Sequence, residues 1–139
     1  MKSYIDSSVI LRVVLGQKDS LAEWKSISVG ITSALTEVEC LRTLDRLSLR
    51  KDVKTRELAI RRSTIYEMLQ RLEVIELSRP VLARAGHPFP TPLGTLDAIH
   101  LASALLWRDR PGESNLFFAT HDLELGLAAK SSGFAVLGV

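Results

Sequence analysis

Residues 1–11 read MKSYIDSSVIL, a short strand-like segment that runs into an aspartate, two serines and a second apolar run. An ionised carboxylate that enters the core without a partner is strongly unfavourable, or else it stays protonated. Asp6 therefore either caps the helix that follows or binds a cation. Ser7 and Ser8 are also favourable N-cap residues, so the local pattern leaves both interpretations open.

Short apolar strands alternate with helical stretches along the chain. The strands are predicted at Ser3–Ile5, Val29–Thr32, Val74–Leu77, Leu116–Ala119 and Ala135–Leu137. The helices are predicted at Ser8–Leu15, Ser20–Lys25, Ala34–Leu49, Val53–Leu72, Pro80–Ala85, Thr95–Arg108 and Leu123–Ser132. This alternation favours an α/β fold with a mainly parallel sheet and right-handed crossovers.

The length of 139 residues predicts a single domain over residues 1–139, with a helical hairpin arm at about 34–72. The net charge of +2 favours no class of partner. The cations crowd between Arg42 and Arg71, so the arm is either an ordinary solvated surface or a phosphate-facing one. The single Cys40 suits a reducing cytoplasm, and neither a secretory signal nor a membrane-spanning run is predicted.

Two of the acidic residues follow predicted strands directly. Asp6 ends the first strand, and Asp122 comes shortly after the strand at Leu116–Ala119. Ligands of open parallel sheets bind outside the carboxyl ends of the strands, where the strand order reverses. If the first and fourth strands flank that point, both carboxylates meet in one crevice. Helix capping is the alternative interpretation for each of them.

Two further acids are predicted to lie on helices. Asp97, His100 and Ser103 share one stripe of a helix that is otherwise apolar, and such a stripe needs a polar neighbour. Capping from the first turn is the alternative for Asp97. In the helix Ala34–Leu49, the apolar stripe of Ala34, Val38, Leu41 and Leu44 includes Glu37 but not Glu39. Periodicity alone does not choose between these two glutamates.

Three segments in this order resemble the PIN domain, and in particular the ribonuclease toxins of VapBC-type toxin–antitoxin pairs. They read IDSSVIL (5–11), TLDAIHLASAL (95–105) and ATHDLELGLAA (119–129), and the spacing from Ser33 to Glu39 also matches the family pattern. The resemblance spans the chain and implies a three-layer α/β/α fold with a central sheet of four to five strands.

The resemblance also implies a site. It assigns the acidic metal-binding and catalytic positions to Asp6, Glu39, Asp97 and Asp122, and supporting hydroxyl positions to Ser8 and Thr120. Asp6 and Asp97 are expected to be direct ligands, with Glu39 and Asp122 binding the ion or orienting water. His121 stands where the family often has tyrosine, and it is interpreted either as an RNA contact or as an ordinary surface histidine.

Several carboxylates cannot share one pocket in the ionised state unless a cation neutralises them. Oxygen ligands with waters left over suit Mg²⁺ or Mn²⁺. Such an ion supports in-line hydrolysis of an RNA phosphodiester without a covalent enzyme intermediate. The resemblance further implies an RNA substrate, a homodimer and a cognate antitoxin protein.

Other classes of function fit less well. Cys40, His87, His100 and His121 show no zinc-ligand spacing, and His100 is expected to be satisfied within the stripe of Asp97. An aspartyl phosphatase would need a second aspartate at position 8, where Ser8 stands. The alternative from another class is a non-catalytic PIN-like scaffold that binds RNA or protein, although such a scaffold has no reason to keep four mutually repelling acids.

Overall fold

The computed structural model describes residues 1–50 and 53–139, and it contains one parallel sheet in the order β3-β2-β1-β4-β5. The strands are β1 (Lys2–Ile5), β2 (Val29–Ser33), β3 (Glu73–Ile75), β4 (Leu116–Ala119) and β5 (Ala135–Leu137). The predicted parallel α/β architecture is confirmed. The strand order reverses between β1 and β4, as the interpretation of Asp6 and Asp122 requires.

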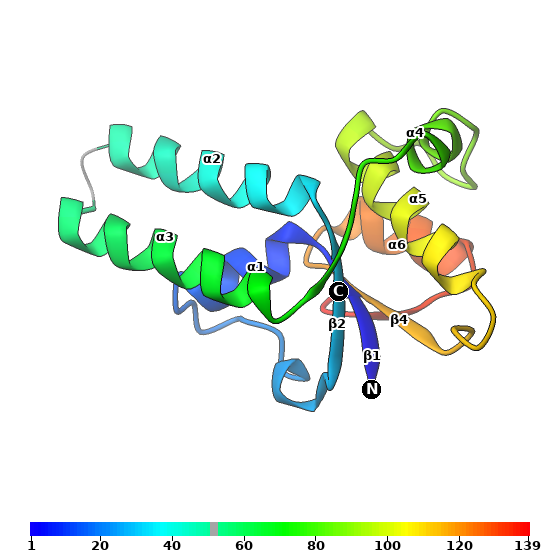
Figure 1. Ribbon diagram of the computed structural model, residues 1–139, viewed down its shortest axis with the longest axis horizontal. Coiled ribbons are helices and arrows are strands. Elements are labelled where there is room, and N and C mark those ends of the chain that lie inside the picture. The colour runs from blue at the N-terminus through cyan, green and yellow to red at the C-terminus, as the bar shows by residue number, and fades with distance from the viewer. Residues whose placement is uncertain (51–52) are drawn as a thin grey trace.

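The helices cover both faces of the sheet and produce three layers (Figure 1). They are α1 (Ser7–Val14), the 3-10 helix η1 (Trp24–Ser26), α2 (Leu35–Leu49), α3 (Thr55–Gln70), α4 (Arg79–Ala85), α5 (Thr95–Arg108) and α6 (Leu123–Ser131). Helices α1, α2 and α3 share one core with the sheet, whereas α5 and α6 share the other. Helix α4 packs against α5.

The two cores follow from the alternation of side chains along the central strands. Tyr4 belongs to the core under α5 and α6, and the next residue, Ile5, belongs to the core under α1, α2 and α3. Phe118 and Ala119 alternate in the same way on β4. Strands that are buried on both faces tend to read as continuous apolar runs, and β4 does so with the sequence LFFA.

Helices α2 and α3 lie side by side and extend away from the sheet (Figure 1). The hairpin arm was predicted over 34–72, and of this range residues 51–52 lie outside the described part of the chain. Ile65 of α3 is fully buried, as its apolar pattern indicates. The predicted apolar stripe of α2 is correct at Leu41 and Leu44, which pack into the core, but wrong at Val38, which is 55% exposed. The buried residues of α2 are Leu35, Thr36, Cys40 and Leu44.

The helix predicted at Ser20–Lys25 is also wrong. Turns and the short η1 occupy this region, and Leu21 is its one buried side chain between residues 17 and 28. A helix of six residues is unstable in isolation, and this segment adds only one buried side chain to the core. The other differences are shifts of element ends, such as β3 at 73–75 instead of 74–77. None of the helices in the described residues is long and apolar enough to cross a membrane.

The turn after β5 packs against the carboxyl end of β4. We therefore expect glycine substitutions in this turn and in an open turn to change the free energy of unfolding by different amounts. Gly138 has φ +96°, and a Cβ there would lie 2.4 Å from the carbonyl oxygen of Thr120. Gly112 has φ +82° with open space around it. We expect Gly112→Ala to lower the free energy of unfolding by about 1 kcal/mol, and Gly138→Ala by at least about 1 kcal/mol more.

Urea denaturation of both variants measures this difference. Equal losses would show that the turn moves away from Thr120 without cost, and that only the φ angle matters at Gly138.

Candidate metal centre

Asp6 lies at the point where the strand order reverses. Its backbone N–H donates to the carbonyl of Ala119 at 3.0 Å, which continues the β1–β4 pairing by one residue. Asp6 occupies the N-cap position of α1, yet its carboxylate accepts no capping bond from that helix. The side chain is buried, with 4% of the residue exposed. The capping interpretation of the Asp6 carboxylate is therefore wrong for this structure.

Two hydroxyl groups hold the Asp6 carboxylate instead. Ser8 Oγ donates to Asp6 Oδ2 at 2.6 Å, and Thr120 Oγ1 donates to the same oxygen at 2.9 Å. Each hydroxyl in turn accepts a backbone N–H, from His121 at 3.0 Å and from Asp122 at 3.0 Å respectively. Asp6 is thereby tied from both sides to the loop that follows β4. The two hydroxyl positions that the family resemblance implied surround this carboxylate.

Asp122 has the capping role that was one of the two interpretations for it. It is the N-cap of α6, and its Oδ1 accepts the backbone N–H of Leu125 at 2.9 Å. This bond engages Oδ1 and leaves Oδ2 for another partner. The neighbouring His121 is half-buried, and its Nδ1 donates to the carbonyl of Gly138 at 3.0 Å.

Glu39 of α2 approaches Asp6 from the opposite side. Its Oε1 lies 2.5 Å from His100 Nε2, which is itself 3.4 Å from Asp6 Oδ1. One ligand atom from each of Asp6, Glu39 and His100 falls within 4.8 Å of the others. Glu37 is exposed and belongs to no such group in the described residues, so the placement of Glu37 in an apolar stripe is wrong.

His100 is completely buried on α5 and has a partner on each ring nitrogen. Tyr4 Oη lies 2.7 Å from Nδ1, and Glu39 lies on the other side. Burial opposes a positive charge on the ring, but the hydrogen bond to Glu39 and the charges of Asp6, Glu39 and Asp97 raise the pKa of His100 overall. The expectation that His100 is satisfied within the stripe of Asp97 is wrong, because its hydrogen bonds go to Tyr4 and Glu39.

Asp97 lies in the first turn of α5, half-buried, and N-cap Gly94 provides no side-chain cap. Burial and then the charges of Asp122 and Asp6 raise its pKa to about 6, with a smaller contribution from Glu39. Asp97 is outside the compact group of ligand atoms. The charges of the other three predicted acids nevertheless all act on Asp97.

The donor set fits a hard divalent cation. The structure gives none of the four carboxylates a lysine or arginine partner within its described residues, so their charges remain uncompensated except by His100. The nearby Cys40 is a poor ligand, because burial and the charges of Glu39 and Asp6 raise its thiol pKa to about 12. Carboxylate oxygens dominate, which suits Mg²⁺ or Mn²⁺ better than zinc.

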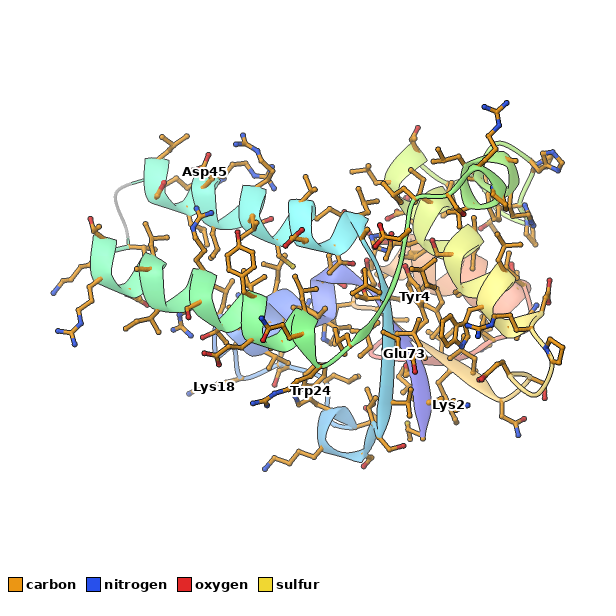
Figure 2. The ribbon with its side chains drawn as sticks, viewed as in Figure 1. Lys2, Tyr4, Lys18, Trp24, Asp45 and Glu73 are labelled. Carbon is orange, nitrogen blue, oxygen red and sulfur yellow. The ribbon has the colours of Figure 1, made fainter. Side chains whose placement is uncertain are left out.

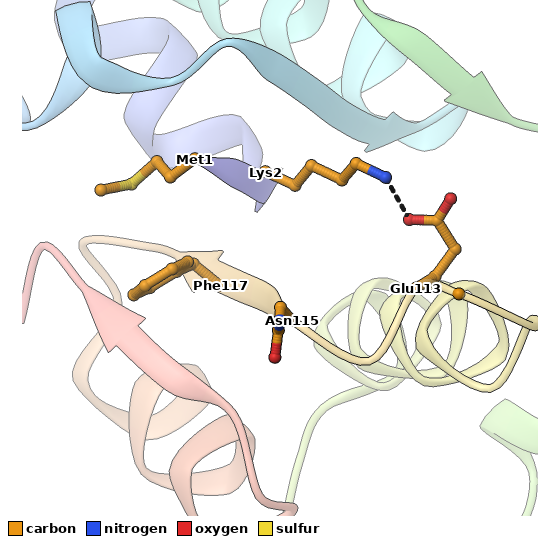
Figure 3. A pocket seen from close by; sticks show the side chains of 6 residues that line it. Met1, Lys2, Glu113, Asn115 and Phe117 are labelled. Carbon is orange, nitrogen blue, oxygen red and sulfur yellow. Dashed lines mark hydrogen bonds and ion pairs between the residues drawn. The ribbon is translucent and has the colours of Figure 1, made fainter.

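A groove lies beside α2, and Glu39 of the site is one of the residues that line it. The other lining residues include Val38, Leu96, Arg42 and Arg46. A second hollow lies at the opposite, amino edge of the sheet, where Lys2 pairs with Glu113 at 2.7 Å (Figure 3). That hollow contains a single acid, already paired, so it does not compete with the carboxyl edge as a metal site.

Comparisons with known proteins agree with this geometry. The family model described as the PIN domain matches residues 3–122. The chain is 34% identical over 137 residues to Ribonuclease VapC46 of Mycobacterium tuberculosis (strain ATCC 25618 / H37Rv). The aligned region covers 96% of this chain and 95% of the relative.

Two solved structures share the fold at low sequence identity. The toxin-antitoxin complex from Klebsiella pneumoniae matches with a TM-score of 0.67 and 15% identity, covering 94% of both chains. Mycobacterium tuberculosis VapC20, a Sarcin-Ricin loop cleaving toxin, matches with a TM-score of 0.63 and 17% identity, covering 96% of this chain and 97% of that one.

The raised pKa of Asp97 predicts that the folding stability of metal-free protein depends on pH. The folded-state pKa of about 6 exceeds the ordinary 3.8, so between these values the folded state binds more protons than the unfolded chain. Stability therefore falls as the pH rises through this window. We expect Asp97→Asn to raise the melting temperature in chelator at pH 7.5, with the gain disappearing toward pH 4.

The matched control is Glu124→Gln, which removes an exposed acid from the first turn of α6. It should give no such gain, because a first-turn carboxylate interacts favourably with the helix dipole. Thermal denaturation over the pH range measures both variants. A lower melting temperature for Asp97→Asn at pH 7.5 would show that the helix dipole outweighs the repulsion among the acids.

Proposed function

The chain belongs to the PIN-domain family, and on that premise we propose that it is a Mg²⁺- or Mn²⁺-dependent endoribonuclease, the toxin of a toxin–antitoxin pair. The observation that carries this proposal is the convergence of carboxylates from separate elements on the carboxyl edge of the sheet. Its position at the switch point between β1 and β4 is where open parallel sheets bind ligands. The curated relative that is named a ribonuclease supports the reaction class.

Asp6 is the central ligand in this proposal, because two hydroxyls fix its carboxylate while leaving its charge uncompensated. Glu39 is the second ligand, since its carboxylate reaches the same space. Asp97, which was expected to be a direct ligand, lies outside the compact group of ligand atoms. In this proposal it joins Asp122 in binding the ion through water or in orienting the attacking water. A bound divalent ion supplies the positive charge that activates water and stabilises the phosphoryl oxygens.

The groove along α2 supports an RNA substrate. Arg42 and Arg46 lie one turn apart on its wall, beside the acidic site. Cations of this kind neutralise phosphates, which supply most of the affinity for nucleic acids. The RNA backbone would therefore run along α2 and present one phosphodiester to Asp6 and Glu39.

The same proposal includes the partners and the cellular location that the family resemblance implies. The chain acts in the cytoplasm, associates as a homodimer, and is held inactive by a cognate antitoxin. One structural relative is a toxin-antitoxin complex, which supports the existence of such a partner. The apolar side chains Val38 and Leu96 line the groove, so it also offers surface for a protein segment.

Metal-dependent cleavage is the main prediction. The pure protein should cut structured RNAs with Mg²⁺ or Mn²⁺, and chelator should abolish cleavage. Asp6→Asn and Asp97→Asn should each reduce the rate at least about 100-fold, because charge stabilisation by the ion contributes several kcal/mol. Gel analysis of end-labelled RNA measures this. Cleavage that survives chelator or both substitutions would contradict the proposal, and folded protein without activity on any RNA would favour the scaffold alternative.

Two glutamates on α2 provide a second prediction with a built-in control. Glu39 lies beside Asp6, whereas Glu37 is exposed two residues earlier on the same helix. We expect Glu39→Gln to lower the cleavage rate about 10-fold or more, and Glu37→Gln to leave it within about twofold. Both exchanges remove one charge at nearly constant volume. Loss of activity in Glu37→Gln alone would show that the wrong glutamate has been assigned.

A further inference from the structure

A line of three polar side chains runs from the core to the acidic site. Tyr4 of β1 is completely buried, His100 of α5 is completely buried, and Glu39 of α2 is at the surface end with 21% of its side chain exposed. The distances along the line are 2.7 Å from Tyr4 Oη to His100 Nδ1 and 2.5 Å from His100 Nε2 to Glu39 Oε1. Three elements that are distant in the sequence meet in this line.

We propose that His100, held by Tyr4, is the positioning residue that aims Glu39 at the metal, and that His100 is not itself a ligand. This inference deepens the proposed function, because it assigns a role within the same site. It concerns metal binding, and it can be tested without any RNA substrate.

The contact with Glu39 determines which nitrogen carries hydrogen. A carboxylate oxygen has only lone pairs to offer, so an imidazole nitrogen 2.5 Å away must donate an N–H to it. His100 Nε2 therefore carries hydrogen, whatever the charge of the ring. A ring nitrogen that carries hydrogen has no lone pair for a cation, so Nε2 cannot coordinate one while it holds Glu39.

The other ring nitrogen is equally unable to reach the metal. His100 Nδ1 faces away from the acids and lies against the hydroxyl of Tyr4. Tyr4 is itself held by its neighbours: its ring stacks on Phe118 with centroids 5.1 Å apart and meets the His100 ring edge-on at 6.0 Å. Figure 2 marks the position of Tyr4 in the interior. The imidazole is consequently fixed from behind by rigid core groups.

The hydrogen bond from His100 matters because the side chain of Glu39 is long and flexible. Glutamate has three rotatable side-chain bonds, and ordering a free one costs conformational entropy each time an ion binds. Asp6 has its own hydroxyl partners, whereas His100 is the only side-chain hydrogen-bond partner that the described structure provides for the Glu39 carboxylate. A preset Glu39 binds the ion without that cost. Partners of this kind behind metal ligands typically change affinity 10- to 100-fold.

A double-mutant cycle on Mn²⁺ affinity tests the inference. We expect His100→Leu to weaken Mn²⁺ binding about 10-fold, and the same change in a Glu39→Gln background to weaken it no more than about twofold. His100→Gln should retain most of the affinity, because its amide N–H can stand in for Nε2–H. Calorimetric titration or the electron paramagnetic resonance of free Mn²⁺ measures each variant, and Phe134→Leu controls for general loss of core stability.

The result that would overturn the inference is additivity. A His100→Leu effect of equal size with and without Glu39 would mean that His100 binds the ion directly. A further measurement is the ¹⁵N spectrum of the His100 ring in metal-free protein and with saturating Mg²⁺. Retention of the Nε2 hydrogen supports positioning, whereas its loss on adding Mg²⁺ would identify a ligand.

These outcomes separate the inference from the proposed function. Coupling between His100 and Glu39 in Mn²⁺ binding, together with failure to cleave RNA, would refute only the ribonuclease proposal. RNA cleavage with metal, together with additive effects at the two residues, would refute only the positioning role. A wild-type protein that binds no Mn²⁺ would overturn both.

Discussion

The buried carboxylate of Asp6 is the constraint on which the site depends. The strand order places Asp6 beside the end of β4, because β1 and β4 pair in register up to Ile5 and Ala119. Its hydroxyl partners come from α1 and from the loop after β4, and the second of them, Thr120, is 114 residues away from Asp6 in the sequence. The two cores fix those segments, and the position of Asp6 is therefore a consequence of packing on both faces of the sheet.

The fold was largely predictable because its strands and buried helices carry strong local patterns. The inner strand β4 is a continuous apolar run, LFFA, and α5 is apolar nearly all round. The segment Ser20–Lys25 was mispredicted because residue composition favours a helix there while the tertiary structure supplies only one anchor, Leu21. The sequence also did not reveal that Val38 is exposed. A helical wheel places Val38 on the buried face of α2, but in the structure Val38 lines a groove.

The site was predictable only in part, for a physical reason. Asp6 and Asp122 follow strands, and the topology of a parallel sheet brings strand ends together. The choice of Glu39 over Glu37 depends on a partner 61 residues away, His100, which no periodicity can reveal. The role of Tyr4 was hidden for the same reason, because a tyrosine in an apolar strand reads as a core residue. Contacts between distant elements carry this information, and local patterns do not.

Hydroxyl groups, rather than lysine or arginine, hold the carboxylate of Asp6, and this choice has a consequence for function. Hydroxyl groups satisfy the lone pairs of Asp6 but leave its charge in place. The nearest arginines on α2 are engaged elsewhere, Arg42 with Asp45 and Arg46 with Thr43. Burial, followed by the charges of Asp122 and Asp6, raises the pKa of Asp97 to about 6. A lysine or arginine inside the pocket would fix the same geometry while cancelling the field that attracts a divalent ion. The arrangement therefore keeps the carboxylate of Asp6 in place without an ion and preserves the negative charge that the proposed metal site requires.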